Sequence, residues 1–429
     1  MSFIVGLVLF ALGIVLTIAL HECGHMVSAR ACGMRVRRYF IGFGPTLFSF
    51  RRREKKTSAA AAGRPLMTEY GLKAVPFGGF CDIAGMTAID EVAPEDEPFS
   101  MVKRPVWQRL IVLLGGIMMN LLIGVIVMYF VAVAWGLPNP NVDLSAKVGS
   151  TQCVPQSASA NSSSQDSSTP DCSGPGPAGK AGIRQGDTIV KVDGHDTPDF
   201  TTMGDVVQKI GRDHADDDHD PTVPVVVERN GETRTVDVTI QRVQRETTQG
   251  KTVTVGAIGM TWECPNNMYS HYNALSAIPG SLHYSGYMIG QSVVGLAKLP
   301  ASVPGVVRSI GGGERSESSP MSVVGASVAG GDLVKHDQCS SFFLLLASLN
   351  FFLALFNLVP LPPLDGGHVA VTIWEKLRDM VRRLRGLSPL GPADYTKLMP
   401  LTVAVFVLLF GFGALVIVAD VVNPIRLFG

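Results

Sequence analysis

Four long apolar runs constrain this chain more than any other feature of its sequence. A helix needs about 20 apolar residues to cross the hydrocarbon core of a bilayer. Only 17% of the 429 residues are charged, which is low against about 25% in soluble proteins. The sequence therefore predicts a polytopic α-helical membrane protein with four transmembrane helices, centred on the runs 3–20, 110–135, 342–359 and 401–418.

The first run is expected to be a retained helix and not a cleaved signal peptide. No positive charge precedes it, and no small-residue cleavage site separates it from the polar residues that follow. The net charge of the whole chain is +0, so no basic footprint indicates a nucleic-acid partner. The expected partner at this stage is the lipid bilayer.

A His-Glu-x-x-His motif closes the first run and consists of His21, Glu22 and His25. Residues four apart on a helix share one face, so the two imidazoles can hold one metal ion. Glu22 lies beside them, close enough to take a proton from a water on that metal. A helix-capping histidine pair at the membrane surface is the structural alternative. Ionisable side chains in an apolar helix nevertheless indicate function by default.

Asp365 follows the third run. A proline-rich stretch ends the helix there and places the carboxylate just beyond the helix end. Two crossings separate this end from His21, so Asp365 is expected to return to the same side of the membrane. A catalytic zinc site keeps three protein ligands and one open position. His21, His25 and Asp365 supply three ligands, and Glu22 is left as the base.

Basic residues set the expected orientation. Lysines and arginines outnumber acids in the loops after the first and third runs, so both loops should be cytoplasmic and the insert after the second run should face outward. Prolines interrupt residues 274–313, which we expect to form surface-lying or short amphipathic helices. An extra crossing there would reverse the third run.

The domain organisation follows from these runs and loops. The predicted segments are a first transmembrane helix at 1–30, a cytoplasmic loop at 31–109 with a membrane-associated β-hairpin at 71–86, a second transmembrane helix at 110–136, a Ser/Pro/Gly-rich linker at 137–180, a soluble domain at 181–270, an extracytoplasmic amphipathic segment at 271–337, a third transmembrane helix at 338–368, a cytoplasmic loop at 369–398 and a fourth transmembrane helix at 399–422.

Two stretches carry weaker signals. A glycine pair breaks the apolar alternation of residues 75–83 and favours a hairpin, although an ordinary surface turn explains this stretch equally well. In the second run, Gly116 and Asn120 suit a close helix contact with a polar partner, and plain helix packing is the alternative.

The insert should fold outside the membrane. Residues 181–270 predict a small domain with a turn, a strand and a second turn within 183–194, a short helix at 206–210, and two strands at 223–228 and 233–240 joined by an Asn230–Gly231 hairpin turn. Cys153 and Cys172 in the linker can form a disulfide if this side faces outward.

Taken together, these motifs resemble the site-2 protease family of intramembrane zinc metalloproteases. The first helix carries HExxH, the second Gly-x-x-x-Asn, and the third Asn-x-x-Pro-x-Pro-x-Leu-Asp-Gly. Residues 182–194 are similar to the core of a bacterial PDZ domain, as in the actinobacterial members. The resemblance implies a Zn²⁺ cofactor, with His21, His25 and Asp365 as ligands and Glu22 as the catalytic acid and base.

The resemblance also implies residues that hold or shape the substrate. A membrane-dipping hairpin would offer an edge strand to the unwound substrate, since edge addition holds an extended peptide. The substrate-binding residues implied in this way are Asn357, Pro360, Pro362, Gly78, Gly79, Phe80 and Asn120.

The implied activity is regulated intramembrane proteolysis in a bacterial inner membrane. Single-span proteins such as anti-sigma factors would be the substrates, with the active site near the cytoplasmic side and the PDZ domain outside. The long Ser-rich stretch before Ala181 departs from a PDZ peptide site, so peptide capture and a size gate both stay open.

Two other functions remain as alternatives. A non-enzymatic adaptor would use a structural metal, and a transporter would need internal inverted repeats, of which the sequence shows no sign. A Glu22→Gln variant separates the enzyme from the adaptor, because only the enzyme needs that carboxylate.

Overall fold

The computed structural model describes residues 1–53, 67–86, 90–155, 157–158, 172–246, 252–311, 315 and 319–425. The chain forms two compact units. The first contains residues 1–137 and the C-terminal part from His271, and the second contains residues 138–270. Residues 156 and 159–171 of the predicted linker at 137–180 lie outside the described residues, whereas its residues 146–151 form a strand.

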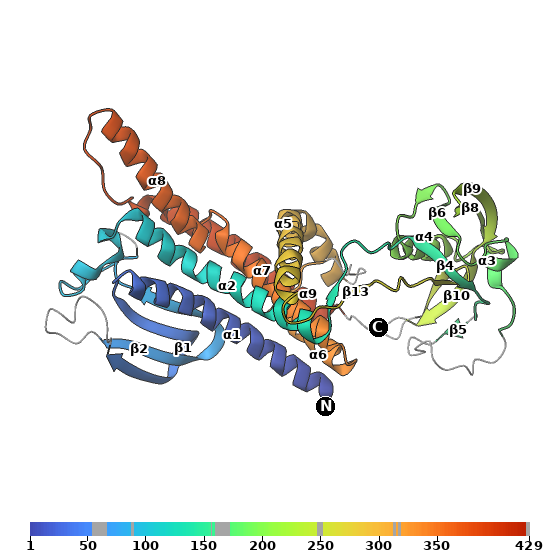
Figure 1. Ribbon diagram of the computed structural model, residues 1–429, viewed down its shortest axis with the longest axis horizontal. Coiled ribbons are helices and arrows are strands. Elements are labelled where there is room, and N and C mark those ends of the chain that lie inside the picture. Colours follow the sequence, from blue (N-terminus) through green and yellow to red (C-terminus); the bar gives the residue numbers. More distant parts are fainter. Residues whose placement is uncertain are drawn as a thin grey trace. The chain divides into compact units, whose positions relative to one another are not determined.

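The first unit is built from helices (Figure 1). Among the described residues, five helices are long and apolar enough to cross a membrane. They are α1 (Ser2–Ala31), α2 (Val106–Ala134), α5 (Ala277–Ile310), α7 (Cys339–Leu358) and α9 (Met399–Val422). The other elements of helical type are α6 (Val323–Lys335), α8 (Asp365–Leu384), η2 (Glu97–Phe99), η3 (Met101–Lys103) and η4 (Tyr395–Leu398).

Helix α5 differs from the sequence-based expectation of short pieces interrupted by prolines. It runs for 34 residues with Pro300 and Pro304 inside it. A proline removes one hydrogen bond from a helix interior, but it does not end a helix that packing holds on both sides of it. Ala277 near the start of α5 packs against α2 and α7, and Val306 near its end packs against α9.

Glycines bring α1 and α2 into backbone contact. A Cβ atom on Gly24 would overlap the carbonyl oxygen of Gly115, so the two helices pack as closely as main chains allow. The N-terminal half of α1 packs against α6 in the same way, because Gly330 and Gly331 leave room for the rings of Phe10 and Phe3.

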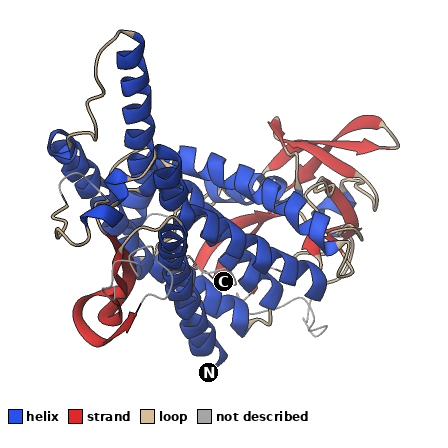
Figure 2. Cartoon of the chain, turned by 60° about the vertical axis from the view of Figure 1, so that its left-hand side comes forward, coloured by secondary structure: helices blue, strands red, loops and turns tan. Residues whose placement is uncertain are grey.

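The strands β1 (Val36–Arg53) and β2 (Met67–Ile83) form an antiparallel sheet beside these helices (Figures 1 and 2). Both strands bend, so that the segments pair in the order 79–83, 36–41, 67–73, 46–53. Residues 71–86, expected to form a hairpin of their own, instead pair with β1 on both sides of the bend in β2. Gly78 has φ +97° and bends β2, and residues 79–83 pair with 36–41 at one edge of the sheet.

The second unit contains a sheet in the order β12-β4-β6-β8-β9, with β7 paired to β6. A smaller sheet has the order β11-β10-β5. The bounds are β3 (Leu137–Pro138), β4 (Ala146–Thr151), β5 (Ser157–Ala158), α3 (Gly176–Lys180), β6 (Thr188–Val192), β7 (His195–Asp196), α4 (Phe200–Asp213), β8 (Thr222–Arg229), β9 (Glu232–Thr239), β10 (Gln241–Glu246), β11 (Thr252–Ala257), β12 (Met260–Trp262) and β13 (Tyr269–Ser270).

The local predictions for this unit hold closely. The predicted helix and strands correspond to α4, β6, β8 and β9. Asn230 and Gly231 have φ of 54° and 82°, as a tight hairpin turn requires. Cys153 and Cys172 form a disulfide with a Cα–Cα distance of 5.7 Å.

Candidate active site

Three side chains from distant parts of the sequence meet where α1 approaches the start of α8. His21 and Asp365 are 344 residues apart in the chain, yet His21 Nε2 lies 3.1 Å from Asp365 Oδ2. His25 Nε2 lies 3.3 Å from His21 Nε2 and 3.3 Å from the same carboxylate oxygen. Both histidines are buried.

This triangle fits a tetrahedral metal ion. Zinc bonds of about 2.0–2.1 Å at tetrahedral angles place neighbouring ligand atoms about 3.3–3.4 Å apart. The three observed separations of 3.1–3.3 Å lie close to that value. Among the described residues, this is the one group of three potential ligand atoms that lie within 4.8 Å of one another.

Main-chain and side-chain partners prepare the ligand atoms. The carbonyl oxygen of Val112 on α2 lies 2.7 Å from His25 Nδ1. A proton on Nδ1 donates to that carbonyl, which leaves Nε2 free to bind a metal. Asp365 Oδ2 lies within 3.3 Å of Nε2 of both histidines, where it can serve as the third ligand atom.

Gly116 makes room for the two imidazoles. A Cβ atom there would lie 2.7 Å from His21 Nε2 and closer still to His25 Nε2. The helix α2 can therefore pass directly behind the histidines only with glycine at this position. Asn120, one turn further along α2, is buried, and its side-chain oxygen has no hydrogen-bond partner among the described residues.

Glu22 faces the edge strand 79–83 of the β1–β2 sheet. A Cβ atom on Gly79 would lie 3.2 Å from Glu22 Cγ and 3.5 Å from Ile18 Cγ2, so α1 packs against this strand at Glu22. The carboxylate thus lies between the histidines on its own helix and the main chain of the edge strand.

The other predicted site residues lie on β2, near the end of α7 and in the turn before α8. Phe80 stacks on Phe40 with ring centroids 5.5 Å apart, and Gly78 packs against Phe43 at the bend. Asn357 is half-buried near the end of α7, and Pro360 is exposed and Pro362 half-buried in the turn that follows.

Several residues at the site were not singled out from the sequence. Gly366 and Gly367 let the first turn of α8 pack against residues 358–362, because a Cβ atom at either would overlap that backbone. The doubled glycine after Asp365 was the available signal. Arg109 on α2 and Glu375 on α8 form a buried ion pair at 2.7 Å, which distant sequence positions could not reveal.

Comparison with known proteins agrees with this geometry. The model of peptidase family M50 matches residues 9–388. The chain is 44% identical over 430 residues to zinc metalloprotease Rip1 of Mycolicibacterium smegmatis and 45% identical over 433 residues to that of Mycobacterium tuberculosis, covering 100% of each chain. It is also 26% identical to metalloprotease MmpA of Caulobacter vibrioides, over 86% of this chain and 85% of the relative.

Proposed function

Because the chain belongs to peptidase family M50 and is a zinc metalloprotease, we propose that it cleaves peptide bonds inside or at the edge of the membrane. The substrates would be single-span proteins, with anti-sigma factors as the first candidates, cut during transmembrane signalling. The observation that carries the proposal is the convergence of His21, His25 and Asp365 beside Glu22.

The proposed roles follow from the chemistry of each side chain. His21, His25 and Asp365 would hold the zinc, which would supply a Lewis acid that makes water nucleophilic near neutral pH. Glu22 accepts the proton of the attacking water and later gives it to the leaving amine. Val112 and Gly116 keep both imidazoles in the orientation that this requires.

The edge strand 79–83 is the proposed docking site for substrate. A helical substrate hides its backbone, so it must unwind before a protease can reach a peptide bond. Residues 79–83 pair on one side only within the described sheet, and an extended peptide can add to the other side. Gly79 and Phe80 would then contact the substrate close to Glu22. Asn357, Pro360 and Pro362 would line the opposite side.

Four crossings account for the helices, with α5 lying along one end of the bundle. The start of α5 packs near the C-terminal end of α2, and its end packs near the C-terminal end of α9. Both of these ends lie opposite His21, because α2 runs antiparallel to α1 and because Asp420 on α9 binds the N-terminus of α6, which packs on the first half of α1. Figure 1 shows α5 running across the direction of α1 and α2.

The expected orientation follows from this count. The basic loops after α1 and α7 would be cytoplasmic, the active site would lie near the cytoplasmic face of a bacterial inner membrane, and the second unit would be extracytoplasmic. Its strands and two helices support a PDZ-like domain.

The second unit is better suited to a size gate than to peptide capture. A peptide adds to a PDZ domain along a strand beside a helix. Here α4 lies directly on β11, since a Cβ atom on Gly211 would overlap the backbone nitrogen of Gly256. That contact leaves no room for a peptide between them.

The test is cleavage of a membrane-spanning peptide by purified protein in mixed micelles, together with its zinc content. The wild type should cleave the peptide and contain one zinc ion per chain. Glu22→Gln should abolish cleavage and retain zinc, whereas Asp365→Ala should lose both. Undiminished cleavage by Glu22→Gln would refute the proposed mechanism.

A further inference from the structure

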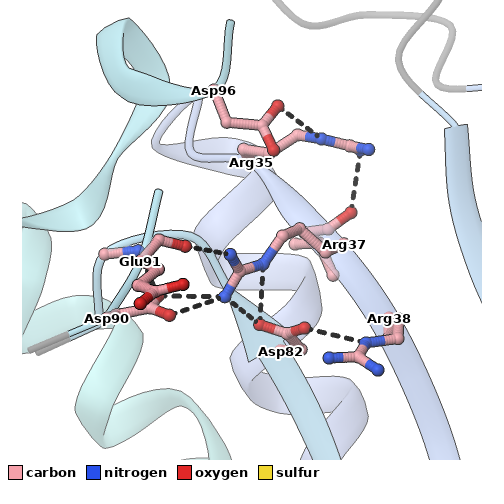
Figure 3. A network of polar contacts seen from close by, with 9 residues as sticks. Arg35, Arg37, Arg38, Asp82, Asp90, Glu91 and Asp96 are labelled. Atoms are coloured by element: carbon pink, nitrogen blue, oxygen red, sulfur yellow. Dashed lines mark hydrogen bonds and ion pairs between the residues drawn. The ribbon is translucent and has the colours of Figure 1, made fainter. Parts of the chain in front are cut away.

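A network of arginines and acids joins the edge strand to the chain that follows it (Figure 3). The Arg37 guanidinium donates to Asp82 Oδ1 at 2.6 and 2.9 Å and to both carboxylate oxygens of Asp90 at 2.9 Å. It also donates to the carbonyl oxygen of Glu91 at 3.1 Å. Asp90 in turn accepts the N–H of Gly85 at 2.7 Å.

The network fixes one end of the strand that faces Glu22. Asp82 lies three residues after Gly79, where an added Cβ atom would come within 3.2 Å of Glu22 Cγ. Successive side chains of a strand point to opposite faces. Cys81 accordingly packs with the apolar cluster of Met26 and Met34, while Asp82 meets Arg37 on the other face.

Charge and burial distinguish Arg37 from its neighbour. The side chain of Arg37 is 24% exposed and bridges two carboxylates, and Asp82 is 13% exposed. Arg38 also donates to Asp82, at 3.0 Å, but its side chain is 56% exposed and makes no second ion pair among the described residues. Planar, charge-assisted contacts such as those of Arg37 are the stronger kind.

We propose that Arg37 is a positioning residue for the substrate: by bridging Asp82 and Asp90 it holds strand 79–83 in the register that presents its free edge beside Glu22. This inference rests on the proposed docking of substrate to that strand. Main-chain hydrogen bonds to an edge strand give an added peptide its affinity, so a strand released at one end should hold the substrate less tightly.

The loss should appear in substrate binding. Main-chain contacts from the strand hold the substrate equally before and during the reaction, so their loss raises KM and leaves kcat nearly unchanged. We expect Arg37→Gln to raise KM at least tenfold with kcat within twofold of wild type. Arg38→Gln is the matched control and should change neither constant by more than twofold.

Binding can be measured apart from cleavage. In a Glu22→Gln background, Arg37→Gln should weaken binding of the same spanning peptide at least tenfold, with unchanged zinc content. Asp90→Asn removes one arm of the bridge and should reproduce most of this loss. The double variant Arg37→Gln with Asp90→Asn should lose no more than Arg37→Gln alone, because both changes break the same link.

The outcomes separate this inference from the proposed function. Failure of the wild type to cleave would end the proposed function. With an active wild type, equal effects of Arg37→Gln and Arg38→Gln, or a loss confined to kcat, would overturn the role given to Arg37. A thermal midpoint that falls without any change in KM would assign the network to folding alone and would equally overturn it.

Discussion

At the scale of single residues, the proposed metal centre depends on the absence of a side chain at Gly116 of α2 as much as on the proposed ligands of α1. A Cβ atom on Gly116 would overlap both imidazoles. The His-Glu-x-x-His pattern and Asp365 could be found in the sequence because each carries its own chemistry. The need for glycine at 116 is a matter of distance, which only the packed helices reveal.

Replacing Gly116 by alanine should therefore disrupt the metal site. The added Cβ atom would overlap the space of His21 Nε2 and His25 Nε2, and we expect zinc content and cleavage to fall at least tenfold. The matched control is Gly411→Ala on α9, where nothing lies within 4 Å of the new atom. Zinc analysis of both purified variants checks this, and a zinc-loaded, active Gly116→Ala would contradict it.

A second residue-scale prediction concerns acid stability of the second unit. Asp187 is buried, which opposes its ionisation, but hydrogen bonds from Arg229 and from the Arg184 backbone prevail and lower its pKa. A carboxyl with a lowered folded-state pKa stabilises the fold above its unfolded value, near 3.9, and loses this contribution as the pH falls through the folded value.

Asp187→Asn should thus lower the unfolding midpoint of this unit near neutral pH, by roughly 5 °C. The difference from wild type should shrink below about pH 4, where Asp187 takes up a proton in the unfolded chain while the folded carboxylate still resists protonation. Calorimetric scans of the full chain between pH 3 and 7 measure this. A difference that stays constant over the whole range would contradict it.

At the scale of elements, the sequence predicted reactive motifs and long apolar helices better than it predicted which strands and charged residues pair with one another. Residues 36–53 were expected to lie in a cytoplasmic loop because they are rich in arginine, and they form an 18-residue strand. Their charges do not require a solvated loop, since Arg35 and Arg37 pair with Asp96, Asp82 and Asp90. Those partners come 45 or more residues later, beyond the reach of a local pattern.

Helix α5 was missed for a similar reason. Its prolines indicate interruption when the segment is considered alone, and contacts with α2, α7 and α9 keep it continuous. The long apolar helices α1, α2, α7 and α9 could be predicted, because length and apolar content decide them without help from partners.

The junction of α6 and α9 offers a prediction at this scale. Arg315 and Asp420 form an ion pair at 2.5 Å with side chains only 2% and 0% exposed, and Asp420 also accepts the backbone N–H of Ser322 at the start of α6. Removing one partner of such a buried pair typically costs about 3–5 kcal/mol.

Asp420→Ala should accordingly lower the thermal midpoint of the protein in detergent, because Arg315 keeps a buried charge. Asp420→Leu combined with Arg315→Met should recover most of the loss. Glu97→Ala, which removes an exposed pair with Lys103, should leave the midpoint unchanged. Equal thermal midpoints for Asp420→Ala and wild type would show that the ion pair does not stabilise the packing of α6 against α9.

At the scale of the whole molecule, the proposed path through the membrane can be tested with native cysteines. Cys264 and Cys339 are free and exposed, and they flank α5 in the sequence. With α5 lying along one side of the bilayer, both thiols face the same compartment. A crossing by α5 would separate them.

In variants that keep one free cysteine each, a membrane-impermeant thiol reagent should label Cys264 and Cys339 from outside intact cells. Ser388→Cys, in the loop after α8, should react with the same reagent only after the cells are permeabilised. Labelling of Cys264 without Cys339 would overturn the four-crossing arrangement.

The free edge of strand 79–83 has a consequence for selectivity. A partner bound through amide and carbonyl groups offers the same repeating pattern whatever its side chains, so this surface by itself discriminates poorly between amino-acid sequences. Under the proposed docking, selection among membrane proteins would depend on the free energy needed to unwind each one's transmembrane helix. Glycines, prolines or polar residues that destabilise a transmembrane helix would then identify a substrate better than any consensus sequence around the cleaved bond.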